Sequence, residues 1–193
     1  MSVKIFYDLE TTGVEVKKHS IHQIAGIVEV DGEVAETFDI RTRPHPKAEI
    51  TEKAMIVGGV TEEQVLAYKP MREAYFELRD IVLRYIDSYS TTDRATLIGF
   101  NNRFFDDQFL RAWFKQNESA MFDNWFWSDT RDVMVLASEY LDDRRSSMPS
   151  FKLKRVALTL GINVDESRLH DGGYDVELTR KIYRTVTFLE IEL

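Results

Sequence analysis

Cysteine is absent from the 193 residues of this chain. Its absence excludes disulfide bonds, thiolate-ligated zinc or iron–sulfur sites, and cysteine nucleophiles. Histidine is scarce as well, with only four in the chain. A metal site would therefore depend on carboxylate oxygens, which favour hard cations such as Mg²⁺ or Mn²⁺ over zinc.

Long apolar runs are missing too. No segment is long enough to span a membrane, and the first residues do not form a secretory signal. We therefore expect a soluble, cytoplasmic protein with no membrane partner. Glycine and proline number only 9 and 4, which excludes a fibrous chain, and 44% of the residues are hydrophobic. The length and this composition predict one domain over residues 1–193.

Acidic residues outnumber basic ones, 33 to 25, and give a formal net charge of −8. Taken alone, this balance argues against a nucleic-acid partner. One segment has the opposite sign, because residues 144–155 (RRSSMPSFKLKR) hold five basic side chains and no acid. This segment is either a solvated surface or a rim that contacts phosphates.

The hydrophobic pattern predicts a mixed α/β fold. A strand at Val3–Tyr7 precedes a hairpin whose strands, Ile21–Val30 and Glu33–Arg41, flank the Asp31-Gly32 pair typical of a type I′ turn. A further buried strand is predicted at Thr96–Phe100. We therefore expect three antiparallel strands followed by parallel strands, with helices on both faces. Helices are predicted near 52–56 and at 71–88, 106–115, 129–140, 152–160 and 174–189.

Two carboxylates follow the first strand. Asp8 and Glu10 are two positions apart, so they share one face of the strand. A bound cation would relieve their repulsion, although such a pair is also common at a solvated strand end. Another acid, Asp106, comes just after the strand at 96–100, where a helix begins. The alternative role of Asp106, or of Asp107, is to cap that helix.

A third polar cluster lies at residues 170–175 (HDGGYD). His170 has the side chain best suited to accept a proton near neutral pH, and Asp175 stands close to the start of the last helix. The alternative is an exposed loop histidine beside a capping aspartate. Gly172 and Gly173 predict that this loop is mobile when neither metal nor substrate is bound.

The segments DLETTG, NNRFFD and HDGGYD, in this order, resemble the three signatures of the DEDDh 3′→5′ exonucleases. These enzymes form a DnaQ-like branch of the RNase H-like superfamily. Residues 99–107 (GFNNRFFDD) and 148–162 (MPSFKLKRVALTLGI) are especially similar to bacterial exonuclease I. The resemblance covers most of residues 3–185 and implies an RNase H-like, five-stranded mixed sheet.

The resemblance also implies roles for the matching residues. Asp8, Glu10, Asp106 and Asp175 would bind two Mg²⁺ or Mn²⁺ ions, and His170 would be the general base of a two-metal hydrolysis. The reaction would release nucleoside 5′-monophosphates from a 3′ end. Contacts with the terminal nucleotide are implied for six residues: Leu9, Thr11, Thr12, Val14, Asn102 and Phe105.

The sequence leaves the substrate open. Similarity to exonuclease I favours single-stranded DNA or frayed ends, and an RNA 3′→5′ exonuclease is the alternative. A third possibility is a proofreading subunit that docks on a polymerase or repair partner. Two bound ions would add about four positive charges among the acids, so the net charge does not exclude nucleic acid. Gly58 departs from the family pattern, which often has histidine or asparagine there, and this leaves the nucleotide preference open.

Overall fold

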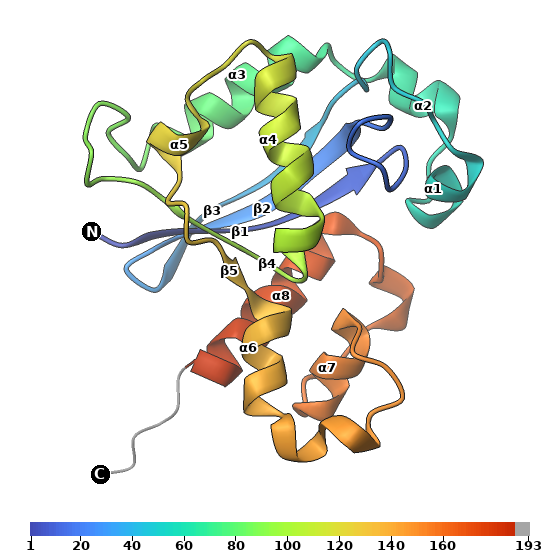
Figure 1. The fold of residues 1–193 in the computed structure, drawn as a ribbon, viewed down its shortest axis with the longest axis vertical. Coiled ribbons are helices and arrows are strands. Elements are labelled where there is room, and N and C mark those ends of the chain that lie inside the picture. Colours follow the sequence, from blue (N-terminus) through green and yellow to red (C-terminus); the bar gives the residue numbers. More distant parts are fainter. Residues whose placement is uncertain (188–193) are drawn as a thin grey trace.

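A five-stranded sheet with the strand order β3-β2-β1-β4-β5 forms the centre of the computed structural model, which describes residues 1–187 (Figure 1). β1 (Val3–Thr11), β2 (Ile21–Val30) and β3 (Glu33–Arg41) are antiparallel. β4 (Thr96–Gly99) and β5 (Arg131–Asp132) continue the sheet in parallel with β1. The predicted order of antiparallel and then parallel strands is confirmed.

Helices cover both faces of this sheet. α3, α4 and α5 pack on one face, and α6, α7 and α8 pack on the other (Figure 1). No helix among the described residues is long and apolar enough to cross a membrane. The helices are α1 (Glu52–Val57), α2 (Glu62–Ala67), α3 (Met71–Val82), α4 (Asp106–Gln116), α5 (Phe122–Trp125), α6 (Val133–Tyr140), α7 (Leu153–Thr159) and α8 (Gly172–Thr187), with 3₁₀ turns η1 (Asn102–Phe104), η2 (Asp142–Ser147) and η3 (Glu166–Arg168).

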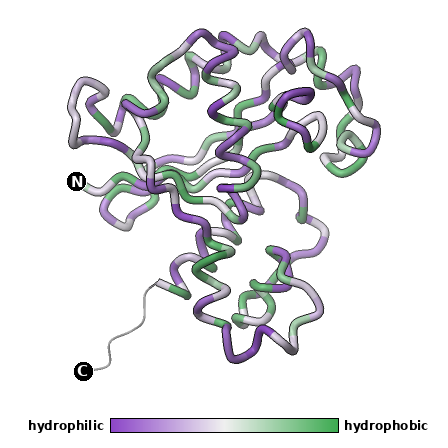
Figure 2. The backbone as a smooth tube through the Cα atoms, viewed as in Figure 1, coloured by the Kyte–Doolittle hydropathy of each residue, from purple (hydrophilic) through white to green (hydrophobic). Residues whose placement is uncertain are grey.

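The central strand β1 contributes to a hydrophobic core on each side of the sheet. Ile5 and Tyr7 belong to the cluster under α3–α5, whereas Phe6 belongs to the cluster under α6–α8. Side chains of a strand alternate between the two faces, so a strand covered on both sides is apolar throughout. Hydrophobic segments accordingly run through the sheet in Figure 2. Trp125 and Phe126 are buried in the first cluster.

Local turn chemistry explains where the hairpin and one helix begin. Asp31 and Gly32 both have positive φ angles, 49° and 95°, as the predicted type I′ turn requires. The helix predicted at 129–140 begins only at Val133, because Arg131–Asp132 pairs with β4. The Asp132 carboxylate then caps this helix by accepting a hydrogen bond of 2.9 Å from the Met134 N–H.

Three other helices differ from the prediction. α3 ends at Val82 rather than at residue 88, and α2 was not predicted although Thr61 and Gln64 form its capping box. α8 begins at Gly172, two residues earlier than expected. The predicted end of this helix, at residue 189, lies outside the described residues.

α8 is held against the sheet by a buried ion pair. The Arg180 guanidinium lies 2.8 Å from Glu29 on β2, a carboxylate whose side chain is only 2% exposed. Lys4 lies 3.5 Å from the other oxygen of Glu29. At the start of α8, a Cβ on Gly172 would lie 3.1 Å from the Ala25 Cβ, so this glycine permits close approach to the sheet. The helix that carries Asp175 is therefore fixed along its length.

We predict that Arg180→Ala lowers the free energy of unfolding by about 2–3 kcal/mol. The substitution removes a positive charge that balances the negative charge of the buried Glu29 carboxylate. Chemical denaturation measures this change. The control is Arg79→Ala, which removes an exposed ion pair of 2.7 Å with Asp80 and should cost less than about 1 kcal/mol. If both variants lost the same free energy of unfolding, the stabilising role of the Glu29–Arg180 ion pair would be contradicted.

Candidate active site

Three acids meet where β1 ends. Asp8 and Glu10 point to the same side of the strand and are half-buried. Asp106, at the first position of α4, is buried beside them. Its Oδ1 accepts a hydrogen bond of 3.2 Å from the backbone N–H of Leu9, the residue between the two β1 acids. The strand backbone thus fixes the position of Asp106 relative to Asp8 and Glu10.

Asp175 and His170 occupy the loop and first turn of α8. The Asp175 side chain is 9% exposed, and its Oδ2 accepts a hydrogen bond of 3.3 Å from the His170 backbone N–H. Its Oδ1 is buried and has no hydrogen-bond partner. Asp171 caps the helix, because its Oδ1 accepts from the Tyr174 N–H at 3.2 Å. Asp175 is therefore not the capping aspartate, and His170 is exposed to solvent.

Electrostatic coupling joins the four carboxylates. Burial raises the pKa of Asp8 well above its ordinary value, and the charges of Asp106, Glu10 and Asp175 raise it further. The pKa of Glu10 rises to about 7, first through burial and then through Asp175. Burial also raises the pKa of Asp106 to about 8, against hydrogen bonds from its own and the Leu9 N–H. The pKa of Asp175 is raised mainly by burial.

This donor set fits divalent cations. All four ligands are carboxylates, which hard ions such as Mg²⁺ and Mn²⁺ prefer. Asp175 Oδ1 is a buried acceptor with no partner, and the four raised pKa values reflect burial and repulsion that positive charge would relieve. Among residues 1–187 no three acidic or histidine side chains are already close enough to hold an ion. Small side-chain movements would therefore accompany metal binding.

The neighbouring acid, Asp107, has a different role. It is buried and accepts hydrogen bonds from the Tyr7 hydroxyl, from Asn102 Nδ2 at 3.1 Å and from Thr130 Oγ1 at 2.6 Å. Neither it nor Asp106 caps α4, because the N-cap position is Phe105 and no side chain caps it. The capping alternative for these two acids is wrong. Asp107 instead ties β1, η1 and the segment before β5 together.

The six predicted substrate contacts divide into two groups. Val14 is 78% exposed and Phe105 is half-buried, so both side chains are accessible to a ligand. The second group is buried and includes Thr11, whose hydroxyl donates a hydrogen bond of 2.8 Å to the Gly13 carbonyl. The other three side chains are buried as well, and their contacts with a substrate stay predictions: Leu9, Thr12 and Asn102.

The loop from Thr12 to Ser20, which carries Val14, is organised by His19, a residue outside the three signature segments. The buried His19 ring packs against Gly13, and its Nδ1 accepts a hydrogen bond of 3.0 Å from the Glu15 N–H. A Cβ on Gly13 would lie 2.3 Å from His19 Cδ2. The glycine of the DLETTG segment therefore leaves space for an imidazole ring.

Gly58 and His22 also border the acids. A Cβ on Gly58 would lie 3.6 Å from Glu10 Oε2 and 3.7 Å from His22 Cε1. Both ring nitrogens of His22 are buried without partners, and burial together with the Arg41 charge lowers its pKa to about 4. His22 is therefore neutral at pH 7. In the sequence, the only indication that residue 58 borders the acids was that Gly58 departs from the family pattern.

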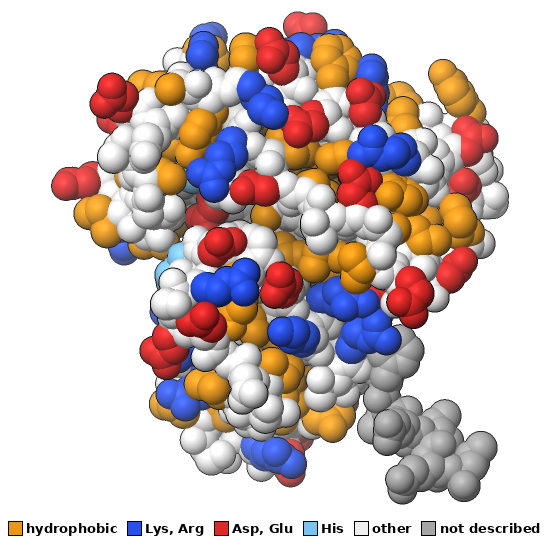
Figure 3. Space-filling model, turned by 180° about the vertical axis from the view of Figure 1, so that it is seen from behind, with side chains coloured by type: hydrophobic (Ala, Val, Ile, Leu, Met, Phe, Trp, Pro, Cys, Tyr) orange, Lys and Arg blue, Asp and Glu red, His pale blue; other side chains and the backbone are white. Residues whose placement is uncertain are grey.

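The basic segment at residues 144–155 has local partners. Lys154 Nζ lies 2.7 Å from Glu166 Oε1, and the Arg145 guanidinium lies 4.3 Å from the Phe151 ring centroid. On the face seen in Figure 3, acidic and basic side chains are interspersed rather than separated. These contacts favour a solvated surface, the first of the two roles considered for the segment.

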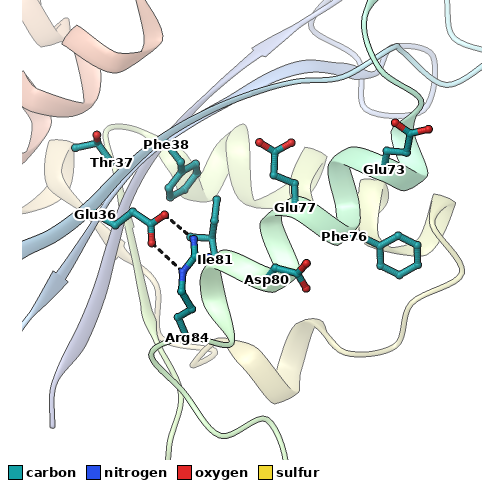
Figure 4. Close-up of a pocket in the computed structure, with 9 residues that line it drawn as sticks. All are labelled: Glu36, Thr37, Phe38, Glu73, Phe76, Glu77, Asp80, Ile81 and Arg84. Atoms are coloured by element: carbon teal, nitrogen blue, oxygen red, sulfur yellow. Dashed lines mark hydrogen bonds and ion pairs between the residues drawn. The ribbon is translucent and has the colours of Figure 1, made fainter.

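A groove of about 560 Å³ between β3 and α3 is separate from these acids (Figure 4). None of the predicted site residues lines it. Four acids line the groove, and three of them form ion pairs with basic side chains. The pairs are Glu36 with Arg84, Glu77 with Lys69 and Asp80 with Arg79, and the fourth acid is Glu73. The groove is thus a charged, ion-paired surface, and the candidate active site remains the edge at the end of β1.

Comparison with known proteins identifies the family of this chain. The sequence model of the RNase_T family, described as exonuclease, matches residues 5–183. The chain belongs to this exonuclease family. It is 28% identical over 195 residues to exodeoxyribonuclease I of Escherichia coli (strain K12), covering 92% of this chain and 38% of that protein. It is 24% identical to a DNA polymerase III PolC-type of Mycoplasmopsis pulmonis (strain UAB CTIP), covering 93% of this chain but only 11% of the polymerase.

Solved structures establish the fold of this exonuclease family member. The zinc-bound form of an E. coli exonuclease I complex with single-stranded DNA matches with a TM-score of 0.78 and 21% identity, over 98% of this chain and 41% of that one. A complex of the same enzyme with a dT13 oligonucleotide matches with a TM-score of 0.76 and 22% identity, over 97% and 41% of the two chains. The predicted RNase H-like fold is confirmed. The chain spans well under half the length of these relatives.

The raised pKa values predict an unusual pH dependence of stability. A carboxyl group whose pKa is higher in the folded state binds protons on folding, so its contribution to stability is present below its unfolded pKa and is lost as pH rises through the folded value. In EDTA, thermal stability should therefore fall between about pH 4.5 and pH 8, the window set by Glu10 and Asp106. Mn²⁺ should restore it, most strongly at pH 8. Thermal denaturation at several pH values measures both effects.

Asp8→Asn should reduce both the loss of stability and the response to Mn²⁺, whereas Glu73→Gln, at an exposed acid, should leave them unchanged. A melting temperature at pH 8 that is the same in EDTA and in Mn²⁺ would contradict the carboxylate site.

Gly13→Ala should destabilise the protein by about 1–3 kcal/mol, because the new methyl group overlaps the buried His19 ring. Chemical denaturation of the two single variants and the double variant Gly13→Ala/His19→Ala provides the test. Since removal of the ring vacates the space, the double variant should lose less stability than the sum of the two single losses. Strict additivity would show that the steric conflict is absent.

Proposed function

We propose that this chain is a metal-dependent 3′→5′ exonuclease that removes nucleoside 5′-monophosphates from single-stranded DNA or frayed 3′ ends. The observation that carries the proposal is the group of four electrostatically coupled carboxylates at the end of β1, with the exposed His170 bonded through its backbone to one of them. We include in the proposal that residues 1–193 form a single exonuclease domain.

Asp8, Glu10, Asp106 and Asp175 would hold two divalent ions. When bound, such ions supply water activation and charge stabilisation at the scissile phosphate. The carboxylates themselves orient the site, and Asp106 keeps its place through the Leu9 N–H. Asp106 and Asp175 are buried and Asp8 and Glu10 are half-buried, and this partial shielding from water strengthens charge interactions at the phosphate.

His170 is proposed to accept the proton of the attacking water. Its side chain is exposed at the edge of the site, and its backbone is anchored by Asp175 Oδ2. An imidazole is the side chain whose ordinary pKa suits proton transfer near pH 7. The proposed mobility of the loop stays a prediction, although Gly172 has a packing role against Ala25.

Val14 and Phe105 are proposed to contact the terminal base. Phe105 packs against Phe109 with ring centroids 4.9 Å apart, which fixes its orientation. A flat apolar contact accepts any base, so the enzyme would act with little sequence preference. Leu9, Thr12 and Asn102 would support these contacts from their buried positions.

Two alternatives concern the substrate and the biological setting. An RNA 3′→5′ exonuclease would use the same carboxylates, and the assay below separates it from a DNA enzyme. A proofreading role beside a polymerase has one supporting observation, the 24% identity with part of the PolC-type polymerase.

Digestion of 3′- and 5′-labelled DNA and RNA, single- and double-stranded, tests the proposal. We predict immediate release of the 3′ label as a mononucleotide and a shortening ladder from the 5′ label, with Mg²⁺ or Mn²⁺ and not with EDTA. His170→Ala should lower kcat by about 10²–10⁴, the usual contribution of a general base, and Asp8→Ala should abolish turnover.

Matched controls are His45→Ala and Glu73→Ala, which should retain full activity. Cleavage that proceeds in EDTA, or wild-type turnover by Asp8→Ala, would refute the proposed mechanism. Faster digestion of RNA than of DNA would favour the RNA alternative.

A further inference from the structure

Five large apolar side chains within residues 1–187 are more than 70% exposed. Met1 is the first residue, and Tyr89 lies in the segment before β4. The other three are Val14 at 78%, Ile56 at 72% and Phe104 at 76%. Water contact is unfavourable for such large apolar surfaces, so their location is informative.

These three side chains belong to segments that border the carboxylates. Val14 follows Glu10 by four residues, and Phe104 precedes Asp106 by two. Ile56 belongs to α1, whose capping residue Gly58 lies beside the Glu10 carboxylate. In Figure 1, α1 and the start of α4 stand on either side of the end of β1. The three exposed apolar side chains therefore belong to the segments next to the candidate active site.

The exposure of Phe104 is imposed by its neighbours. Before it, Asn102 is buried and bonded to Asp107, and the Arg103 guanidinium donates two hydrogen bonds, of 3.0 and 2.6 Å, to the Thr130 carbonyl. After it, the Phe105 ring packs against Phe109 of α4. The η1 turn is thus anchored on both sides while its aromatic ring faces solvent. A held and exposed ring is the arrangement that stacks on a nucleic-acid base.

We propose that Phe104 stacks on the base next to the terminal nucleotide and thereby favours unpaired 3′ ends. This inference rests on the proposed function. The proposed function assigns the terminal base to Val14 and Phe105. Phe104 is one residue further from Asp106 than Phe105, so its ring is available to the next base. In a duplex that base is stacked between its neighbours and paired, and its face is not free for Phe104. The ring therefore discriminates between single and double strands without reading sequence.

Steady-state hydrolysis of single-stranded oligothymidylate by Phe104→Ala tests this role. We expect KM to rise about tenfold, equivalent to about 1.4 kcal/mol, with kcat at saturation little changed. The ratio of activity on single strands to activity on blunt duplexes should fall. Phe104→Trp should restore both, because the indole offers at least as large a stacking face.

Two controls separate stacking from a structural effect. The p-nitrophenyl ester of thymidine 5′-monophosphate contains only the terminal nucleotide, so Phe104→Ala should hydrolyse it at the wild-type rate. Tyr89→Ala removes another exposed aromatic ring, 94% exposed, from the opposite end of β4 and should behave as wild type in every assay.

A wild-type KM for oligothymidylate in Phe104→Ala, or an equal loss on the nitrophenyl ester, would overturn the stacking role while the exonuclease assignment stands. Complete inactivity of the wild-type chain on every nucleic acid would instead overturn the proposed function, and the inference would fall with it.

Discussion

The mutual repulsion of carboxylates at the end of β1 is the constraint on which the site depends. Asp8 and Glu10 lie on one strand face, Asp106 is tied to the backbone between them, and Asp175 approaches from α8. Burial makes each negative charge costly, and each neighbour adds to that cost. The fold must therefore hold together groups that repel one another, and it uses interactions away from the acids to do so.

Those interactions are hydrogen bonds and packing at the supporting elements. Asp107 links Tyr7, Asn102 and Thr130, so β1, η1 and the segment before β5 cannot separate without breaking a buried network. On the other face, the pairing of Glu29 with Arg180 holds α8 against β2. The acids need not attract each other, because the surrounding elements are fixed independently of them.

Much of this was predictable from local patterns. Alternating apolar residues and the Asp31-Gly32 pair predict the hairpin, whereas the four acids and His170 were assigned through the resemblance of three short segments to the exonuclease signatures. The burial of Thr12 and Asn102 was not predictable, because it depends on long-range contacts such as the bond from Thr12 Oγ1 to the Glu49 carbonyl. The two residues of β5 form a strand only through pairing with β4, so the helical pattern around them misled the prediction.

The wide sequence separation of Asp8 and Asp175 has a consequence for how the protein forms. One acid lies in the first strand and the other in the last described helix, so the two meet only when most of residues 1–187 have folded. A growing chain on the ribosome carries Asp8, Glu10 and Asp106 well before α8 emerges. A chain that stops before residue 170 therefore lacks Asp175 and His170, and the proposed site cannot assemble until this segment has been made.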